Sequence, residues 1–200
     1  MLDVEVIDSP ERAALTLDPI KRRLLAELVT PGSAASLAGR VGLTRQKVNY
    51  HLRALEEQKL VEPAEERHWG GLTERLLVAS AASYVVSPAA LGPLAAEPER
   101  MRDRLSASYL IALAARILRE VGELWRGARN EDKRLATLSL DTVIRFKSPA
   151  ERAAFTHELM SAVASLAARY HDETAPGGRP HRLVVASYPA PEQRTAGKET

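Results

Sequence analysis

The chain has 200 residues, which is enough for one large or two small domains. Its hydrophobic content of 45% is ordinary for a globular protein, and the absence of cysteine excludes disulfides and thiolate metal sites. No apolar run is long enough to span a membrane, and no basic segment opens the chain. We therefore expect a cytoplasmic protein with neither a membrane span nor a secretory signal.

The net charge of +2 does not by itself point to a nucleic-acid partner. In residues 1–96, eleven basic residues face twelve acidic ones, so the net charge of this half is −1, and residues 97–200 carry the remaining +3. The stretch from Arg40 to Arg53, however, contains four basic residues and no acidic one. A local strip of this kind can face phosphates while acids elsewhere cancel the total charge.

Helix signals follow one another from residue 9 to residue 42. Ser9-Pro10 can open a short helix, after a weakly alternating start to the chain. Asp18-Pro19 is a stronger start signal, because an acidic N-cap is followed by proline. The helix that it opens ends at Pro31-Gly32. Residues 33–42 then predict a short alanine-rich helix that closes in a turn at Gly42.

The segment from Thr44 to Leu60 is predicted to form an amphipathic helix, with Thr44 as its N-cap. Its apolar stripe is made by Val48, Leu52, Leu55 and Leu60. Its polar face carries Arg45, Gln46, Asn49 and Arg53. Guanidinium and amide groups have the donor and acceptor geometry to read base edges in a major groove. We therefore interpret the segment as a recognition helix, and an ordinary solvated surface helix is the alternative.

A hairpin is predicted directly after this helix. Two segments of extended character flank His68-Trp69-Gly70-Gly71, and paired glycines between such segments are a hairpin signal. Two helices joined by a glycine turn and followed by a hairpin indicate a winged helix-turn-helix. Arg67, His68 and Arg75 are predicted to reach phosphates or a minor groove. Trp69 either joins them or plugs the wing against the body.

Taken together, these patterns resemble the ArsR-type (arsenic-repressor-like) winged-helix transcriptional regulators over roughly residues 10–82. The resemblance rests on Asp18 to Leu25, Ser36-Leu37-Ala38, Val48 to Leu55 and Leu60-Val61. It implies that His51 matches a family histidine that packs at the core edge, which we favour over a DNA contact. Metal-sensing members of the family use cysteines, or histidines and acids on terminal helices. This chain has no cysteine and no histidine between Trp69 and Phe155, so we expect no metal sensing and no cofactor.

The rest of the chain is not covered by this pattern. Prolines and glycines in residues 80–98 suggest a connection, so we expect a DNA-binding domain over 1–95, a dimerisation and possible effector domain over 96–189, and a disordered tail over 190–200. Glu99 to Arg126 is predicted to form one long amphipathic helix. Its dimerisation residues would be Leu110, Ile117, Val121 and Leu124. Packing of this helix against the following sheet is the alternative.

Two strands and a helix are predicted after the long helix. Residues 137–146 alternate between apolar and polar residues, Ser148 to Glu151 form a capping box that opens a helix, and Arg182 to Tyr188 form a second strand. Because two strands alone are marginally stable, we expect pairing across a dimer or with the N-terminal strand. The predicted fold class is therefore α+β, with a winged helix-turn-helix, a long dimerisation helix and a small strand-helix-strand unit.

The expected function is sequence-specific transcriptional regulation by a dimeric repressor, bound to a double-stranded DNA operator. Arg45, Gln46 and Asn49 would contact bases, and Thr44, Lys47, Tyr50 and Arg53 would contact phosphates. A winged-helix protein-interaction module without specific DNA binding is the alternative.

Chemistry of other kinds finds little support. No nucleophile, phosphate-loop or dinucleotide motif is present, so we do not expect an enzyme. His157 and His171 would lie roughly 21 Å apart along one helix and cannot share a metal. A non-metal small-molecule effector is possible in a pocket between sheet and helices, although the aromatic residues there can equally form plain core. These aromatic residues are Trp125, Phe146, Phe155, Tyr170 and Tyr188.

Overall fold

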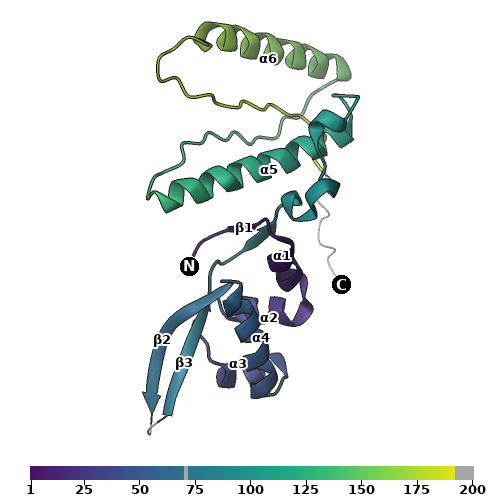
Figure 1. Cartoon of the computed structure of the whole chain (residues 1–200). Coiled ribbons are helices and arrows are strands. Elements are labelled where there is room, and N and C mark those ends of the chain that lie inside the picture. The colour runs from purple at the N-terminus through teal and green to yellow at the C-terminus, as the bar shows by residue number, and fades with distance from the viewer. Residues whose placement is uncertain (70–71, 192–200) are drawn as a thin grey trace, which may run out of the picture. The chain divides into compact units, whose positions relative to one another are not determined.

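The computed structural model describes residues 1–69 and 72–191, except for the side chains of residues 67–69 and 72–73 (Figure 1). Two compact units divide the chain: the first comprises Met1–Leu135 and the second begins at Ala136. A boundary between a DNA-binding and a dimerisation domain near residue 95 stays a prediction, as does disorder of the tail, whose residues 192–200 lie outside the described ones.

Three helices of the first unit begin where the sequence signals lie. They are α2 (Pro19–Glu27), α3 (Ala34–Val41) and α4 (Arg45–Glu57). The Asp18 carboxylate accepts hydrogen bonds from the N–H groups of Ile20 and Lys21 at 3.0 and 2.9 Å, and Thr44 Oγ1 accepts one from Lys47 at 3.3 Å. Gly42 ends α3 with a φ of 69°, which glycine adopts without strain. The predicted start of each capped helix is confirmed.

The apolar stripe of α4 faces the core, as its spacing predicts. Val48 and Leu55 are fully buried and Leu52 is 3% exposed. The prediction that the helix extends to Leu60 is wrong, because α4 ends at Glu57, and Leu60 is fully buried beyond that end. All four residues pack in one cluster with the buried side chains of α2 and α3, which are Leu24, Leu25, Leu28, Leu37 and Val41. This burial leaves the opposite face of α4 in solvent and so determines which of its polar residues are presented.

The predicted wing is an antiparallel hairpin of β2 (Val61–Trp69) and β3 (Leu72–Ala79), and it projects from the helices (Figure 1). Glu66 lies opposite Arg75 in its register. Backbone hydrogen bonds of 2.9 Å in both directions join Gly32 and Leu77 and tie β3 to the turn before α3. The winged helix-turn-helix is confirmed, while the glycines at the tip lie outside the described residues.

A parallel strand pair that the sequence analysis did not predict holds the two ends of this domain together. β1 (Glu5–Ile7) pairs with β4 (Tyr84–Val86), with Glu5 opposite Tyr84. Between them in the chain, Ser9 caps α1 (Pro10–Leu17), as its Ser-Pro signal predicts. After β4 come two short 3-10 helices, η1 (Pro88–Leu94) and η2 (Pro98–Arg100), and Ser87 caps the first of them.

The long helix α5 spans Ala107–Asn130, so the prediction of one helix from Glu99 to Arg126 is wrong at both ends. A polar turn displaces its start. The Asp103 carboxylate accepts a hydrogen bond from the N–H of Leu105 at 2.8 Å, and the Ser106 hydroxyl donates to the Asp103 carbonyl at 2.7 Å. Ser106 then caps the helix by accepting from the N–H of Tyr109 at 3.1 Å.

One face of α5 packs on β1. A Cβ at Gly122 would lie 3.0 Å from Val6 Cγ1, so glycine is what allows the close approach. Arg126 donates to the carbonyl of Val6 at 3.3 Å and pairs with Asp8 at 2.6 Å. At about 100° per residue, the proposed dimerisation residues lie on the opposite side of the helix. Of these, Val121 and Leu124 are 42% and 58% exposed.

The second unit is built on α6 (Pro149–Tyr170), which begins at the predicted signal. Ser148 Oγ accepts from the N–H of Glu151 at 3.1 Å, whereas the Glu151 carboxylate accepts from the N–H of Lys147 rather than of Ser148, at 2.5 Å. The prediction of two strands, 137–146 and 182–188, is wrong, because neither segment of the described chain forms a strand. Strand structure needs a hydrogen-bonded neighbour, and a lone edge finds none.

The helices described within residues 1–69 and 72–191 include none with the length and apolar character to cross a bilayer.

Loss of the Asp18 cap is expected to destabilise the protein. The pKa of Asp18 is lowered below the ordinary value of 3.8, and the largest cause is the hydrogen bond that its carboxylate accepts from the N–H of Lys21. Asp18→Ala should decrease the free energy of unfolding by about 1 kcal/mol in urea titrations near neutral pH. Because the folded-state pKa is lowered, this contribution is present above the ordinary pKa and is lost as the pH falls through the folded one.

The difference in the free energy of unfolding between wild type and Asp18→Ala should therefore become smaller below about pH 4. Asp18→Asn is the matched control, since it keeps the cap without the titration. A gap of constant size from neutral pH to about pH 2 would contradict this account.

Candidate nucleic-acid interface

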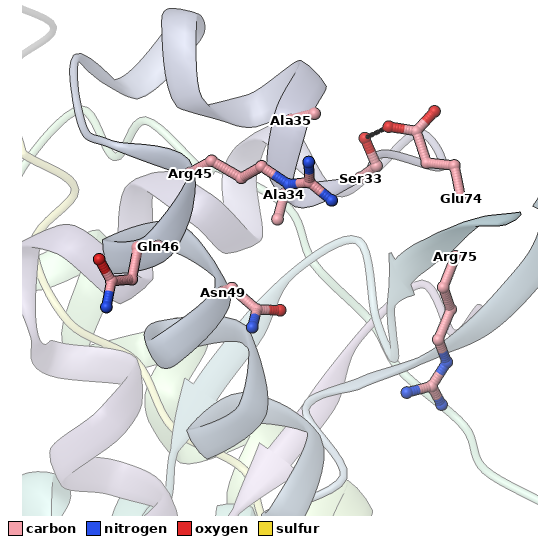
Figure 2. A pocket seen from close by; sticks show the side chains of 8 residues that line it. All are labelled: Ser33, Ala34, Ala35, Arg45, Gln46, Asn49, Glu74 and Arg75. Atoms are coloured by element: carbon pink, nitrogen blue, oxygen red, sulfur yellow. Dashed lines mark hydrogen bonds between the residues drawn. The ribbon is translucent and has the colours of Figure 1, made fainter. Parts of the chain in front are cut away.

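A groove of about 520 Å³ lies between the amino terminus of α3, the exposed face of α4 and strand β3. It is lined by Ser33, Ala34, Ala35, Arg45, Gln46, Asn49, Glu74 and Arg75. Figure 2 shows the side chains of Arg45 and Asn49 extending from α4 toward the space between α4 and β3, while Gln46 points in a different direction. The groove is therefore rich in hydrogen-bonding groups with planar geometry, the kind that reads base edges.

The structure brings the three predicted base-reading residues together along this groove. Arg45, Gln46 and Asn49 are all exposed, because the buried stripe of α4 lies on its other side. Arg45 and Asn49 are four residues apart and share one face. Arg45 and Asn49 thus form one surface with Arg75 of the wing, and Gln46 lines the groove with its side chain turned in another direction (Figure 2).

The residues predicted to contact phosphates lie outside the lining of the groove. These are Thr44, Lys47, Tyr50 and Arg53. All four are exposed, and Tyr50 reaches 72%. At about 100° per residue, Lys47 points roughly 200° away from Arg45 around α4. This arrangement separates a central groove from flanking polar groups.

Among the side chains of the wing that the structure describes, Arg75 is the one basic group, and it forms an ion pair with Glu56. Arg75 Nη1 and Nη2 donate to the Glu56 carboxylate at 3.1 and 2.5 Å, which is a bidentate pair. Glu56 belongs to the last turn of α4, on the same face as Asn49. The side chains of Arg67, His68 and Trp69 lie outside the described residues, so their predicted contacts stay predictions.

A second acid in the groove was missed by the sequence analysis. The Ser33 hydroxyl donates to Glu74 Oε1 at 2.5 Å, across 41 residues of sequence, and Ser33 is 3% exposed. Ser33 is also the N-cap of α3 and accepts from the N–H of Ser36 at 3.1 Å. The hydrogen bond therefore joins the wing to the start of α3. No local pattern signals it, because it depends on how the hairpin folds back.

These contacts give the groove a mixed charge rather than a uniformly basic one. Arg45 and Arg75 are matched by Glu74 and Glu56, which both lie within reach of the same surface. A phosphate oxygen that approaches Arg75 competes with the Glu56 carboxylate for the charge of the guanidinium and for two of its five N–H donors. Affinity for a polyanion therefore depends on this competition and on the flanking residues of α4.

His51 lies at the edge of the core. Its ring is half-buried and meets Tyr50 edge-on, with 5.5 Å between the ring centroids. Its Nδ1 is buried and has no hydrogen-bond partner among the described residues. Within residues 1–69 and 72–191, no three histidine, aspartate or glutamate side chains gather as a metal site would require.

Comparison with known proteins defines the class of this domain. Residues 16–64 match a family described as a helix-turn-helix domain, and this match covers α2, α3, α4 and the start of β2. Among solved structures, this chain is similar to the crystal structure of NolR from Sinorhizobium fredii. The match covers 36% of this chain and 67% of the NolR chain, with 24% sequence identity and a TM-score of 0.30. That score is too low to extend its fold to this chain. No curated protein matches the sequence.

Proposed function

We propose that the chain is a sequence-specific DNA-binding transcriptional regulator of the ArsR-like group, acting in the cytoplasm as a homodimeric repressor without an enzymatic role. The observation that carries the proposal is the groove in which Arg45, Gln46 and Asn49 of α4 meet Arg75 of the wing. This groove belongs to a helix-turn-helix domain whose α4 occupies the place of the helix that enters a major groove.

In the proposed complex, the groove residues and the flanking residues have different tasks. Arg45, Gln46 and Asn49 contact base edges, since guanidinium pairs with guanine and amides pair with adenine. The exposed flank of α4, which is Thr44, Lys47, Tyr50 and Arg53, contacts phosphates and sets the register. The wing residues Arg67, His68 and Arg75 reach the adjacent backbone or minor groove.

The homodimer is supported by the apolar side chains of α5 that lie opposite the face packed on β1. Of these, Val121 and Leu124 are exposed, whereas Leu110 and Ile117 are half-buried. Apolar residues at seven-residue steps suit a partner helix. A two-fold dimer would present two copies of α4 to the two half-sites of an operator.

Control by a non-metal small molecule belongs to the same proposal. Phe146 and Phe155 lie in contact, with ring centroids 5.3 Å apart, whereas Tyr170 and Tyr188 are 77% and 69% exposed. An effector would act by binding one arrangement of the dimer more tightly than another.

Recovery of bound fragments from sheared genomic DNA, at increasing salt, tests the proposed function. We expect a small set of fragments with a shared two-fold motif, held with an affinity that falls as salt rises. Absence of binding to every fragment at low salt would overturn the proposal. It would favour a winged-helix protein-interaction module, which Glu74 in the groove and Glu56 beside Arg75 would suit.

Removal of the acid that holds Arg75 is expected to strengthen DNA binding. Glu56→Gln frees the guanidinium for a phosphate, so affinity for any duplex should rise, and the slope of log K against log salt should steepen by about one ion. Fluorescence anisotropy with a non-specific duplex measures both quantities. The exposed pair contributes about 0–1 kcal/mol to stability, so folding should survive.

Glu57→Gln is the matched control for this change. Glu57 is the exposed neighbour of Glu56, and the same charge is lost at a position about 100° further around α4. An equal gain in affinity for both variants would show that only total charge matters, and would contradict a specific exchange at Arg75.

A further inference from the structure

Residues 137–146 of the second unit form an extended segment that the described chain leaves without a strand partner. Its even-numbered positions are mostly apolar and yet largely exposed, with Leu138 at 94%, Leu140 at 91% and Ile144 at 47%. Its odd-numbered positions are mostly polar. Period-two alternation indicates a half-buried strand, so the sequence encodes a strand whose edges are open.

The helix that follows contacts the apolar face of this segment at its last residue. The ring of Phe146, at the end of the segment, lies 5.3 Å from the ring of Phe155 in the first turns of α6. The N–H of Lys147 is donated to Glu151 and Ser148 caps α6, so the backbone that is free for pairing ends at Phe146. What the strand lacks is a neighbour along its hydrogen-bonding edge.

We propose that this neighbour is the same segment of a second copy, paired antiparallel about a two-fold axis at Val143. In this register Leu140 lies opposite Phe146 and Thr142 opposite Ile144 on the apolar face, which meets α6 at Phe146. Asp141 lies opposite Arg145 on the other face. Each pair occurs twice, as two-fold symmetry requires, and apolar and opposite-charge pairs are the ones that stabilise antiparallel strands.

Charge complementarity and the end of the free backbone at Phe146 together select this register over its neighbours. An axis at Asp141 places two carboxylates directly opposite each other, which is destabilising. An axis at Thr142 leaves Asp141 opposite Val143, without a charge partner. An axis at Ile144 pairs Asp141 with Lys147, but it extends the ladder past Phe146 to Lys147, whose N–H is already donated to Glu151, and to Ser148, which caps α6. Only the axis at Val143 pairs the acid with a base and ends the ladder at Phe146.

The inference deepens the proposed function, because it names a second contact of the proposed homodimer, but it does not depend on DNA binding. It assigns residues 140–146 as the element that completes the second unit in a partner copy. A strand that is marginal within one chain gains a backbone partner in the dimer, with the Phe146–Phe155 contact anchoring it to α6 in each copy.

The absence of cysteine makes a direct test possible with the full chain. Paired antiparallel residues have Cα atoms about 4.5–5.5 Å apart, within the range of about 4.4–6.8 Å that a disulfide spans. Val143→Cys should therefore form a covalent dimer under mild oxidation, seen on a non-reducing gel. Val143 is 79% exposed, so the substitution leaves folding intact.

Thr142→Cys and Ile144→Cys are the matched controls. In each control the two introduced cysteines, one from each copy, would be diagonal neighbours about 7–8 Å apart. They should therefore cross-link poorly. Cross-linking confined to Val143→Cys supports the register. Cross-linking at either control position instead, at all three positions equally, or at none of them would overturn it.

A charge exchange gives a second, independent measurement. Asp141→Arg places one arginine opposite Arg145 of the other copy at each end of the paired strands. It should weaken dimerisation by about tenfold in sedimentation equilibrium. The double variant Asp141→Arg with Arg145→Asp restores opposite charges and should recover the wild-type affinity. A double variant as weak as the single one would overturn the pairing.

The two proposals fail in different ways in these experiments. A covalent Val143→Cys dimer that recovers no genomic fragment would overturn DNA binding and leave the strand pairing standing. Selective recovery of operator fragments by a chain that never cross-links at Val143 would do the reverse. A wild-type chain that stays monomeric at every concentration would overturn the strand pairing together with the homodimer.

Discussion

Arg45→Ala is expected to weaken binding to the selected operator by about 1–3 kcal/mol and to relax base preference at one position of each half-site. Arg45 is exposed on the face of α4 opposite the buried stripe and lines the groove toward β3 (Figure 2). Removal of its guanidinium takes away a bidentate donor to a base edge, whereas a change at the surface leaves the fold intact within about 0.5 kcal/mol. Competition binding with operators substituted at each base pair measures both effects.

Lys47→Ala is the matched control for Arg45→Ala. Lys47 is exposed on the same helix but points away from the groove, and its assigned task is a phosphate contact. It should weaken binding to operator and non-specific DNA alike, and reduce the salt slope by about one ion. An unchanged base preference in Arg45→Ala, or an altered preference in Lys47→Ala, would contradict the division between base and phosphate contacts.

Leu55→Ala is expected to lower the free energy of unfolding by about 2–5 kcal/mol, the largest effect on stability predicted for this chain. Leu55 is fully buried in the cluster that joins α4 to α2 and α3. Truncation of its side chain loses transfer free energy and leaves a cavity among close-packed neighbours. Urea titration should show a lower midpoint with an unchanged slope.

Glu57→Ala controls for the loss of a side chain on the same helix, because Glu57 is exposed and its removal should change stability by less than about 0.5 kcal/mol. At temperatures where Leu55→Ala remains folded, it should still bind the operator, since no groove residue is changed. A loss of less than about 1 kcal/mol would contradict the place of Leu55 at the centre of the core.

Several parts of the fold are determined by the sequence alone, because their causes are local. Asp18, Thr44 and Ser148 each cap a helix through hydrogen bonds to groups two or three residues away. The buried stripe of α4 follows from its spacing, and burial of one face decides that Arg45 and Asn49 are exposed on the other. The wing follows from two extended segments around a glycine pair.

Only the tertiary structure decided the features that depend on distant residues. Three such contacts join segments that no local pattern relates. They are the pairing of β1 with β4, the hydrogen bond from Ser33 to Glu74 and the bidentate ion pair of Arg75 with Glu56. The start of α5 was displaced from Glu99 to Ala107 by a polar turn at Asp103. Of these contacts, those of Glu74 with Ser33 and of Glu56 with Arg75 determine the charge of the groove.

The segment 137–146 shows the same division at its clearest. Its alternation is a property of the sequence, and a strand was predicted from it. In the single chain no strand forms, because a strand is stable only when another backbone satisfies its N–H and C=O groups. Sequence by itself thus determined which residues can share a face, and tertiary structure decided whether a neighbour is present to bind them.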